Sequence, residues 1–303
     1  MTGFYCKSGS GVTDFVANTA YVSGNRIVPD YADAGANFAT ARKWVWECTT
    51  GGTAAAGNPT WPASVTQDVT TVVSGGATFT ARRPGYSSGS TANWTFATPH
   101  YFYGVTALAT AGDILYVSSN HNETIPGAAN GGGTQLSQTS CVSVNDAAAP
   151  PTALLAGASV STTGAGSFSL GANPWGYYYG ITFNSGVGGA SASASISTGA
   201  SGSATYENCN FVLATTGVGA IITLTGVLLN CGYKFGAISH TIGLDAGKIS
   251  GGSLLAGGVS PATLFNGGNF VPMGAGPLYA GRQQGLPPCG GDAGKTKQHY
   301  LIL

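Results

Sequence analysis

Glu123 and His121 are the acid and imidazole that lie closest together in this sequence. A carboxylate beside an imidazole can pass a proton to and from a reacting group, which is general acid–base chemistry. Ser118 and Ser119 come just before them and are the candidate nucleophiles. The order is not that of a Ser–His–Asp triad, however, and no elbow glycines surround either serine. The segment therefore predicts no catalytic site.

Carboxylates are scarce over residues 101–270. A glycosidase needs two of them within roughly 5–10 Å, and a lyase needs acids that hold Ca²⁺ or a base beside its substrate. Asp113 follows a glycine directly before a strand, which is typical of a turn cap. Glu207 and Lys234 are spaced for an ion pair on a solvent face. We therefore expect no enzyme activity. The acids of this region are Asp113, Glu123, Asp146, Glu207 and Asp245, and its lysines are Lys234 and Lys248.

The cysteines and glycines carry no cofactor signature. No Cys-x-x-Cys pair, zinc pattern, phosphate loop or dinucleotide fingerprint is present. Gly-x-Gly strings arise by chance when 49 of 303 residues are glycine. We expect no metal and no cofactor, and we expect the cysteines to be buried free thiols. They are Cys6, Cys48, Cys141, Cys209, Cys231 and Cys289.

Aromatic side chains are the remaining candidates for contact with a ligand. An exposed ring can stack on a sugar or a protein partner, whereas rings that alternate along strands pack across the sheet. Packing is the simpler interpretation, and contact with a partner stays open. The candidate glycan-contacting or partner-contacting residues are Trp44, Trp46, Trp61, Trp94, Tyr101 and Tyr103.

Short strands must position these aromatic residues. The segments 26–28, 43–48 and 76–82 alternate apolar and polar residues between Gly and Pro, which is typical of half-buried antiparallel strands. We expect a small antiparallel β module at 18–84. A lead-in at 1–17 precedes it, and a linker with an aromatic cluster follows at 85–104.

Uncharged sequence dominates the rest of the chain, and no charged residue lies between Asp146 and Glu207. Apolar segments at 177–183, 204–213, 220–229, 248–255 and 263–270 are separated by Gly, Ser and Asn. The strings Asn208–Phe211 and Asn230–Tyr233 lie one coil of a β-solenoid apart, with Asn at the corners and Cys in the interior. We expect an all-β chain with a solenoid at 105–272. Residues 273–303 are then an extended contact arm or an ordinary terminus.

Charged residues make up only 7 % of the chain, and eleven basic side chains balance eleven acidic ones. With no net positive charge, the chain has no electrostatic attraction for nucleic acid or for an anionic membrane. No apolar run has the length of a signal peptide or a membrane span, which predicts a protein made in a host cytoplasm. Strand edges with so little charge are prone to aggregate, and a closed oligomer removes that hazard. The composition favours a part of a larger assembly.

The segment 18–83 resembles a small module found in phage structural and tail proteins. The strings that carry the resemblance are Asn18–Tyr21, Gly24–Pro29, Trp46–Gly51 and Asn58–Pro62. Asn58 stands where Glu is commoner, and Phe79 stands where Trp is commoner. The segment is also similar, more distantly, to chitin-binding modules, which implies aromatic residues that bind sugar.

Residues 107–124 resemble the first coil of pectin-lyase-like β-helices of phage proteins, through the string Gly112–Val117. Gly180–Phe183 and Tyr206–Phe211 are similar to later rungs of that family, and the resemblance covers about 105–270. It implies a right-handed parallel β-helix and a homotrimer. Many members of the family cleave polysaccharides, but this chain is short of the acids that such cleavage needs.

These observations lead to the hypothesis of a non-enzymatic structural protein of a bacteriophage virion. In its first form the protein is a trimeric head decoration or cement protein that contacts itself and the major capsid protein or other virion proteins. In its second form it is a tail-associated adhesin, tailspike-like or fibre-like, that binds host surface glycan. A polysaccharide depolymerase is the third form.

Overall fold

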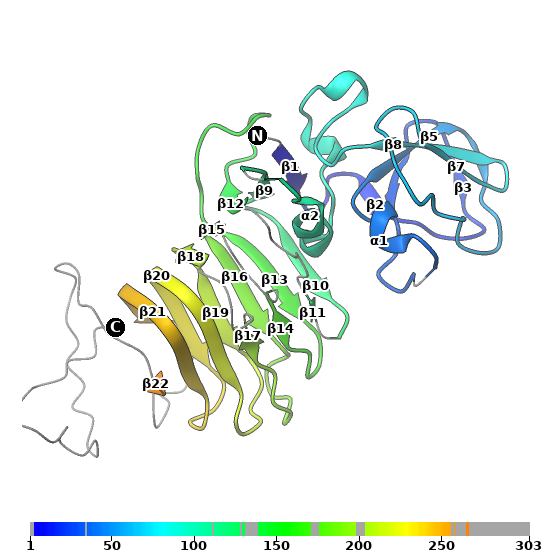
Figure 1. Cartoon of the computed structure of the whole chain (residues 1–303). Helices are drawn as coiled ribbons and strands as arrows, with labels where there is room; N and C mark the ends of the chain where they lie inside the picture. Colours follow the sequence, from blue (N-terminus) through cyan, green and yellow to red (C-terminus); the bar gives the residue numbers. More distant parts are fainter. Residues whose placement is uncertain are drawn as a thin grey trace, which may run out of the picture.

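The computed structural model describes residues 3–33, 35–110, 112–127, 129–130, 139–170, 176–197, 204–255, 258 and 265–266. Within them the chain is mostly β-structure. A large sheet of parallel strands occupies one part of the molecule, and a smaller five-stranded sheet lies beyond one end of it (Figure 1). No helix in the described part of the chain is both long and apolar enough to cross a membrane.

The strands of the large sheet pair in three parallel ladders. The first contains β1 (Gly3–Cys6), β9 (Ile114–Ser118), β12 (Thr139–Val144), β15 (Gly176–Tyr179) and β18 (Ala204–Glu207). The second contains β10 (Asn122–Ile125), β13 (Ala158–Thr162), β16 (Ile181–Ser185) and β19 (Asn210–Leu213). The third contains β11 (Ala129–Asn130), β14 (Phe168–Ser169) and β17 (Ile196–Ser197).

Two long strands run through all three ladders. β20 (Ile221–Phe235) pairs in turn with β17, β18 and β19. β21 (Thr241–Leu254) follows β20 along its length and then pairs with β22 (Phe265–Asn266). Successive stretches of chain therefore visit the three ladders in a fixed order. Because of this order, each strand lies beside its counterpart from the previous stretch.

Aromatic rings stack between equivalent positions of neighbouring strands. Phe183, Phe211 and Tyr233 are register partners on β16, β19 and β20. Their rings stack with centroids 5.9 and 6.1 Å apart, and all three side chains are buried. Tyr178 and Tyr206 stack in the same way at 4.8 Å. The alternating residues of these strands thus give one continuous apolar core.

Single left-handed residues turn the chain from the first ladder to the second. Gly180, Asn208 and Asn230 occupy this corner in three consecutive stretches, with φ of 68°, 51° and 50°. Asn is among the non-glycine residues that best tolerate this conformation, because its short side chain can hydrogen-bond locally. The Asn corners expected from the sequence are confirmed.

The smaller sheet has the strand order β2-β4-β5-β8-β7. Its β2–β4 pair is parallel and its other pairs are antiparallel, so the expected antiparallel module is a mixed sheet. A second correction is α2, a helix (Tyr101–Ala107) that spans the boundary between the expected linker at 85–104 and the expected solenoid at 105–272. The strands are β2 (Val12–Asp14), β4 (Arg26–Val28), β5 (Val45–Thr50), β7 (Thr71–Ser74) and β8 (Ala77–Arg82), with β3 (Ala20–Tyr21) and β6 (Gly52–Thr53) as a separate pair. The remaining helices are α1 (Phe38–Ala41), η1 (Ser88–Ser90) and η2 (Trp94–Phe96).

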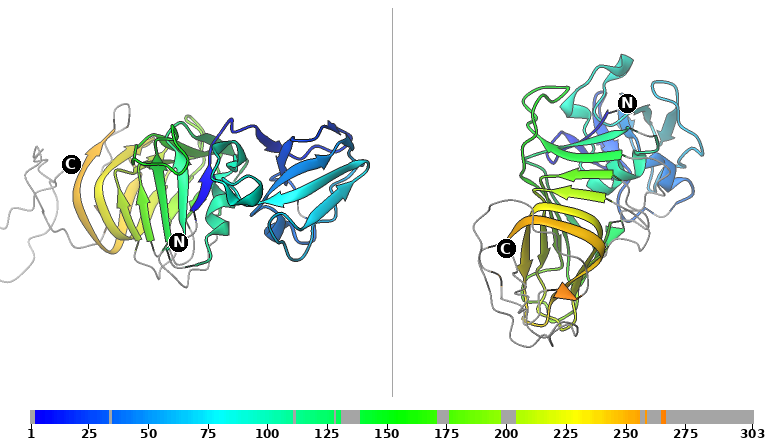
Figure 2. Two further views of the ribbon diagram at one scale, coloured as in Figure 1. Left: turned by 90° about the horizontal axis from the view of Figure 1, so that it is seen from above. Right: turned by 60° about the vertical axis from the view of Figure 1, so that its left-hand side comes forward.

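The smaller sheet is inserted into the large one rather than placed ahead of it. β1 pairs in parallel with β9, although residues 7–113 lie between them in the chain. The chain thus leaves the large sheet after its first strand, builds the smaller sheet and returns through α2 (Figure 2). Residues 1–17, expected as a lead-in, contribute β1 to one sheet and β2 to the other.

Most strands expected from the sequence are present. Each of seven expected segments overlaps observed strands: 26–28 overlaps β4, 43–48 overlaps β5, 76–82 overlaps β8, 177–183 overlaps β15 and β16, 204–213 overlaps β18 and β19, 220–229 overlaps β20, and 248–255 overlaps β21. The expected strand at 263–270 is described only at β22, and the expected arm at 273–303 lies outside the described residues. Five cysteines are buried free thiols as expected, and Cys289 lies outside the described residues.

Candidate functional site

Glu123 collects hydrogen bonds at the point where the two sheets meet. Its Oε2 accepts from the backbone N–H of Tyr101 at 2.6 Å and lies 3.2 Å from Nε2 of His121. Its Oε1 accepts from the hydroxyl of Tyr31 and lies 3.2 Å from Nδ1 of His100. The side chain is buried. A carboxylate in this position needs such partners, because burial of an unpaired charge is costly.

His100 connects Glu123 to the inserted sheet. Its second ring nitrogen, Nε2, lies 2.5 Å from Oδ1 of Asp14, the last residue of β2. Its ring also meets the ring of Tyr31 edge to face, with centroids 4.2 Å apart. We call Asp14, Tyr31, His100, His121 and Glu123 the junction network. It joins strands β2 and β10, which belong to different sheets.

The network stabilises the charged forms of both central groups. Burial alone lowers the pKa of His100, but hydrogen bonds to Asp14 and Glu123 and the charges of these carboxylates raise it to about 9. Burial alone raises the pKa of Glu123, but hydrogen bonds from His100 and His121 and their charges lower it to about 2. At neutral pH an imidazolium thus lies between two carboxylates.

Ser8 extends the network in a line that resembles a nucleophile, a base and an acid. Its Oγ lies 3.0 Å from Nδ1 of His121, whose other ring nitrogen faces Glu123. The hydroxyl also donates to the backbone oxygen of Asn122 at 2.7 Å and accepts from the N–H of Asn122 at 3.1 Å. A nucleophilic serine gives its proton to the base, but here that proton is donated to the backbone. The contacts hold the segment after β1 against β10.

The serine expected beside this site has another partner. Ser118 donates to Oδ2 of Asp146 at 2.7 Å, and the same carboxylate oxygen lies 2.7 Å from Nζ of Lys7. Asp113 accepts from two backbone N–H groups four and three residues before it, so the expected turn cap is confirmed. Sequence reasoning missed Asp14, Tyr31 and His100. These three residues are far from Glu123 in the sequence, and no motif links them to it.

The aromatic residues proposed for glycan or partner contact are mostly inside the protein. A buried ring offers no face to a sugar, so this hypothesis narrows to Trp44, which is half-buried. The indole N–H groups of Trp46, Trp61 and Trp94 donate to Ala41, Asp33 and Ala148 within the chain. The five buried residues are Trp46, Trp61, Trp94, Tyr101 and Tyr103.

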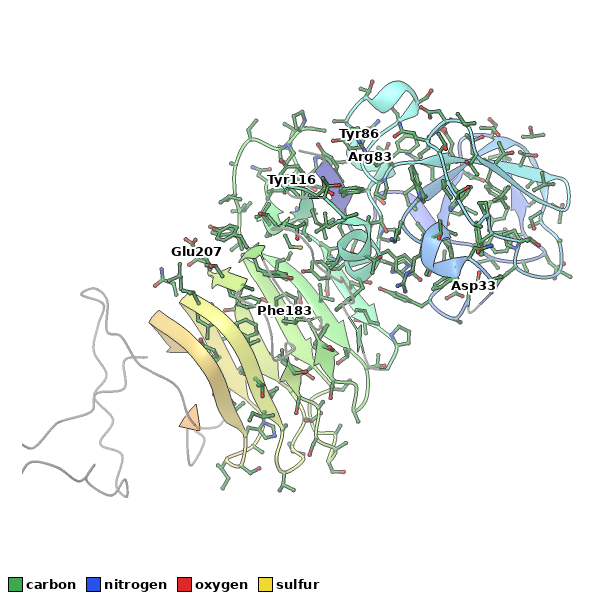
Figure 3. All side chains as sticks on the ribbon, in the orientation of Figure 1. Asp33, Arg83, Tyr86, Tyr116, Phe183 and Glu207 are labelled. Carbon is green, nitrogen blue, oxygen red and sulfur yellow. The ribbon has the colours of Figure 1, made fainter. Side chains whose placement is uncertain are left out.

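Other aromatic side chains, which sequence reasoning did not select, face outward on the first ladder. The rings of Tyr177 and Tyr179 on β15 are half-buried and stack at 6.5 Å. The hydroxyl of Tyr177 donates to Oε2 of Glu207 on β18 at 2.7 Å. The described residues contain no ion pair between Glu207 and Lys234, so that expectation was wrong. Figure 3 shows Glu207 on the large sheet, away from the end where Tyr116 lies.

No group of three or more metal-binding side chains is found among the described residues. Neither a family model nor any curated protein or solved structure matched this chain in the comparisons.

Proposed function

We propose that this chain is a non-enzymatic structural protein of a bacteriophage particle, most simply a trimeric decoration protein on the virion head. The observation that carries the proposal is a row of exposed aliphatic side chains along one corner of the large sheet. Val187, Val218 and Ile238 lie in the loops between the second and third ladders, and they are 49 %, 79 % and 61 % exposed.

These loops are joined to one another. Ser193 donates to the backbone oxygen of Val218, and Nε2 of His240 lies 2.8 Å from the oxygen of Gly217. The segments 186–195, 214–220 and 236–240 contain no Asp, Glu, Lys or Arg. An uncharged ridge with regularly placed aliphatic groups is the kind of surface that buries against a neighbouring subunit. We therefore assign it to contacts between copies of the chain or with the major capsid protein.

The proposal includes a right-handed parallel β-helix for the large sheet. Three ladders visited in a fixed order support it, because a β-helix returns to the same ladder once in each coil. The stacked interior and the Asn corners also support it.

The absence of enzyme activity is also a proposal, and it is supported by the use of the acids. Within residues 101–270, Asp113 caps a turn, Asp146 contacts Lys7 and Glu207 holds a tyrosine hydroxyl. Glu123 is enclosed by the junction network. The remaining acid, Asp245, is in β21, and its side chain is not among those that the structure describes.

Mass measurement of the purified oligomer tests the assembly. We expect a trimer for the native chain and dissociation for Val218→Asp, because the new charge enters the ridge. Val69→Asp is the matched control, since Val69 is 72 % exposed but lies in the turn before β7, in the inserted part of the chain. A native chain that is a stable monomer contradicts the proposal. Antibody labelling of intact particles separates head from tail, and label on tails alone rules out the decoration role.

A tail-associated, glycan-binding adhesin is the second candidate, favoured by the outward pair Tyr177 and Tyr179. Stacked tyrosines beside a carboxylate suit a sugar ring and its hydroxyls. A glycan array with Tyr179→Ala and Trp44→Ala variants tests it, and absence of binding by the native chain leaves this candidate unsupported. Release of reducing ends from host polysaccharide tests for a depolymerase, the least favoured form.

A further inference from the structure

The inserted sheet meets the large sheet through ionisable groups rather than through apolar contact alone. Asp14 and Tyr31 come from the inserted part, Glu123 comes from β10, and His121 immediately precedes β10. His100 immediately precedes α2, on the chain segment that returns to the large sheet. Its two ring nitrogens face one carboxylate from each part, at 2.5 Å and 3.2 Å.

Each element packed around His100 contributes an ionisable group. Beside Asp14 and Glu123, the rings of Tyr31 and Tyr103 lie with their centroids 4.2 and 4.7 Å from the imidazole. The Arg42 guanidinium lies over the ring of Tyr103, and burial and the charge of Asp30 raise the pKa of Tyr103. The thiol of Cys6 contacts the ring of His121, which is the other imidazole beside Glu123.

The geometry points to a proton-operated latch, in which one proton on His100 holds the inserted sheet against the large sheet and loss of that proton releases it. The protonated imidazole has two N–H donors and satisfies both carboxylates. The neutral ring has one donor, so its other nitrogen presents a lone pair to a carboxylate. Two carboxylates then face each other with no cation between them. Because Glu123 is buried, separation of the two parts is its route to water.

The latch is closed at neutral pH and opens in alkali. Hydrogen bonds and charges from both carboxylates outweigh burial and raise the pKa of His100 to about 9. Its proton is therefore present below that pH and is lost above it. This inference concerns the connection between the two sheets and does not depend on the virion role.

A pH titration of the full chain tests the latch. Small-angle scattering measures the radius of gyration, and hydrogen exchange follows the Tyr101 amide that donates to Glu123. We expect both to step upward near pH 9 while circular dichroism and tryptophan fluorescence keep their native values. The absence of a step between pH 7 and 10.5 overturns the proposal.

Variants assign the step to His100. His100→Gln removes the titrating group, so we expect rapid Tyr101 exchange at pH 7 and no alkaline step. Asp14→Asn removes one of the two carboxylates that face His100, so we expect the midpoint of the alkaline step to fall. Because the Asp14 side chain is 41 % exposed, we expect a fall of roughly one pH unit. This variant keeps the test open if His100→Gln does not fold. His240→Gln, which changes a buried histidine elsewhere, is the control and keeps the native midpoint. An unchanged step in both junction variants contradicts the latch.

Discussion

Replacement of Phe211 by alanine tests whether the three ladders enclose a common interior. Phe211 lies between Phe183 and Tyr233, with ring centroids 5.9 and 6.1 Å away, and it meets Tyr206 edge to face at 5.5 Å. Its side chain has no exposed surface. A buried Phe→Ala change costs about 3–5 kcal/mol of unfolding free energy. Since three rings lose a partner, we expect about 4–5 kcal/mol.

Urea unfolding followed by two signals measures this cost. Circular dichroism reports both sheets, whereas tryptophan fluorescence is weighted toward the inserted part, whose apolar core contains Trp46 and Trp61 and packs against Trp44. We expect Phe211→Ala to lower the midpoint seen by circular dichroism and to leave the fluorescence midpoint close to that of the native chain.

Val212→Ala is the matched control for this experiment. Val212 is the next residue of β19 and points to the half-exposed side of the strand. Its loss should cost less than about 1 kcal/mol. If Val212→Ala destabilises the chain as much as Phe211→Ala, residues 211 and 212 do not face inside and outside, and the account of the stacked core is refuted.

Three further changes have defined outcomes. The ionised His100–Glu123 pair should contribute on the order of 3 kcal/mol to the free energy of unfolding. This contribution should be complete between about pH 4.5 and 6.5, and it should fade as the pH rises through 9 or falls through 2. Thermal unfolding measured across this pH range tests it. Asn208→Ala should cost about 1 kcal/mol while Asn208→Gly costs less, because φ at this corner is 51°; equal costs in urea unfolding would exclude this reason. Gly226→Ala should prevent native assembly of the large sheet, since a Cβ there would lie 1.9 Å from the backbone oxygen of Ala204; a soluble variant with a native circular dichroism spectrum would contradict this.

Local features of the chain were readable because they depend on neighbouring residues. The strands at 204–213 and 220–229 follow from alternation and from glycine and asparagine punctuation, and the corners at Asn208 and Asn230 follow from the side chain that tolerates positive φ. The turn cap at Asp113 follows in the same way, since its partners lie three and four residues away. The right-handed β-helix and the virion role go further than these features and stay predictions.

The role of each aromatic residue could not be read in this way. In the sequence, Trp46 and Trp61 could belong either to a sugar-binding surface or to a core. They are buried because β5, which contains Trp46, pairs with β8, and because the loop that contains Trp61 packs against this sheet. Tyr177 and Tyr179 face outward on a strand whose intervening residue, Tyr178, is buried. A run of three tyrosines does not say which of them faces the interior.

The sequence by itself determined that this chain forms short strands with tight corners, buried thiols and little charge, because composition and local spacing decide these properties. Tertiary structure decided the rest. It paired β1 with β9 across residues 7–113 and so made the smaller sheet an insertion. It also turned the Glu123–His121 pair into a junction network by bringing Asp14, Tyr31 and His100 to it. Such contacts depend on where distant strands meet, and sequence spacing does not carry that information.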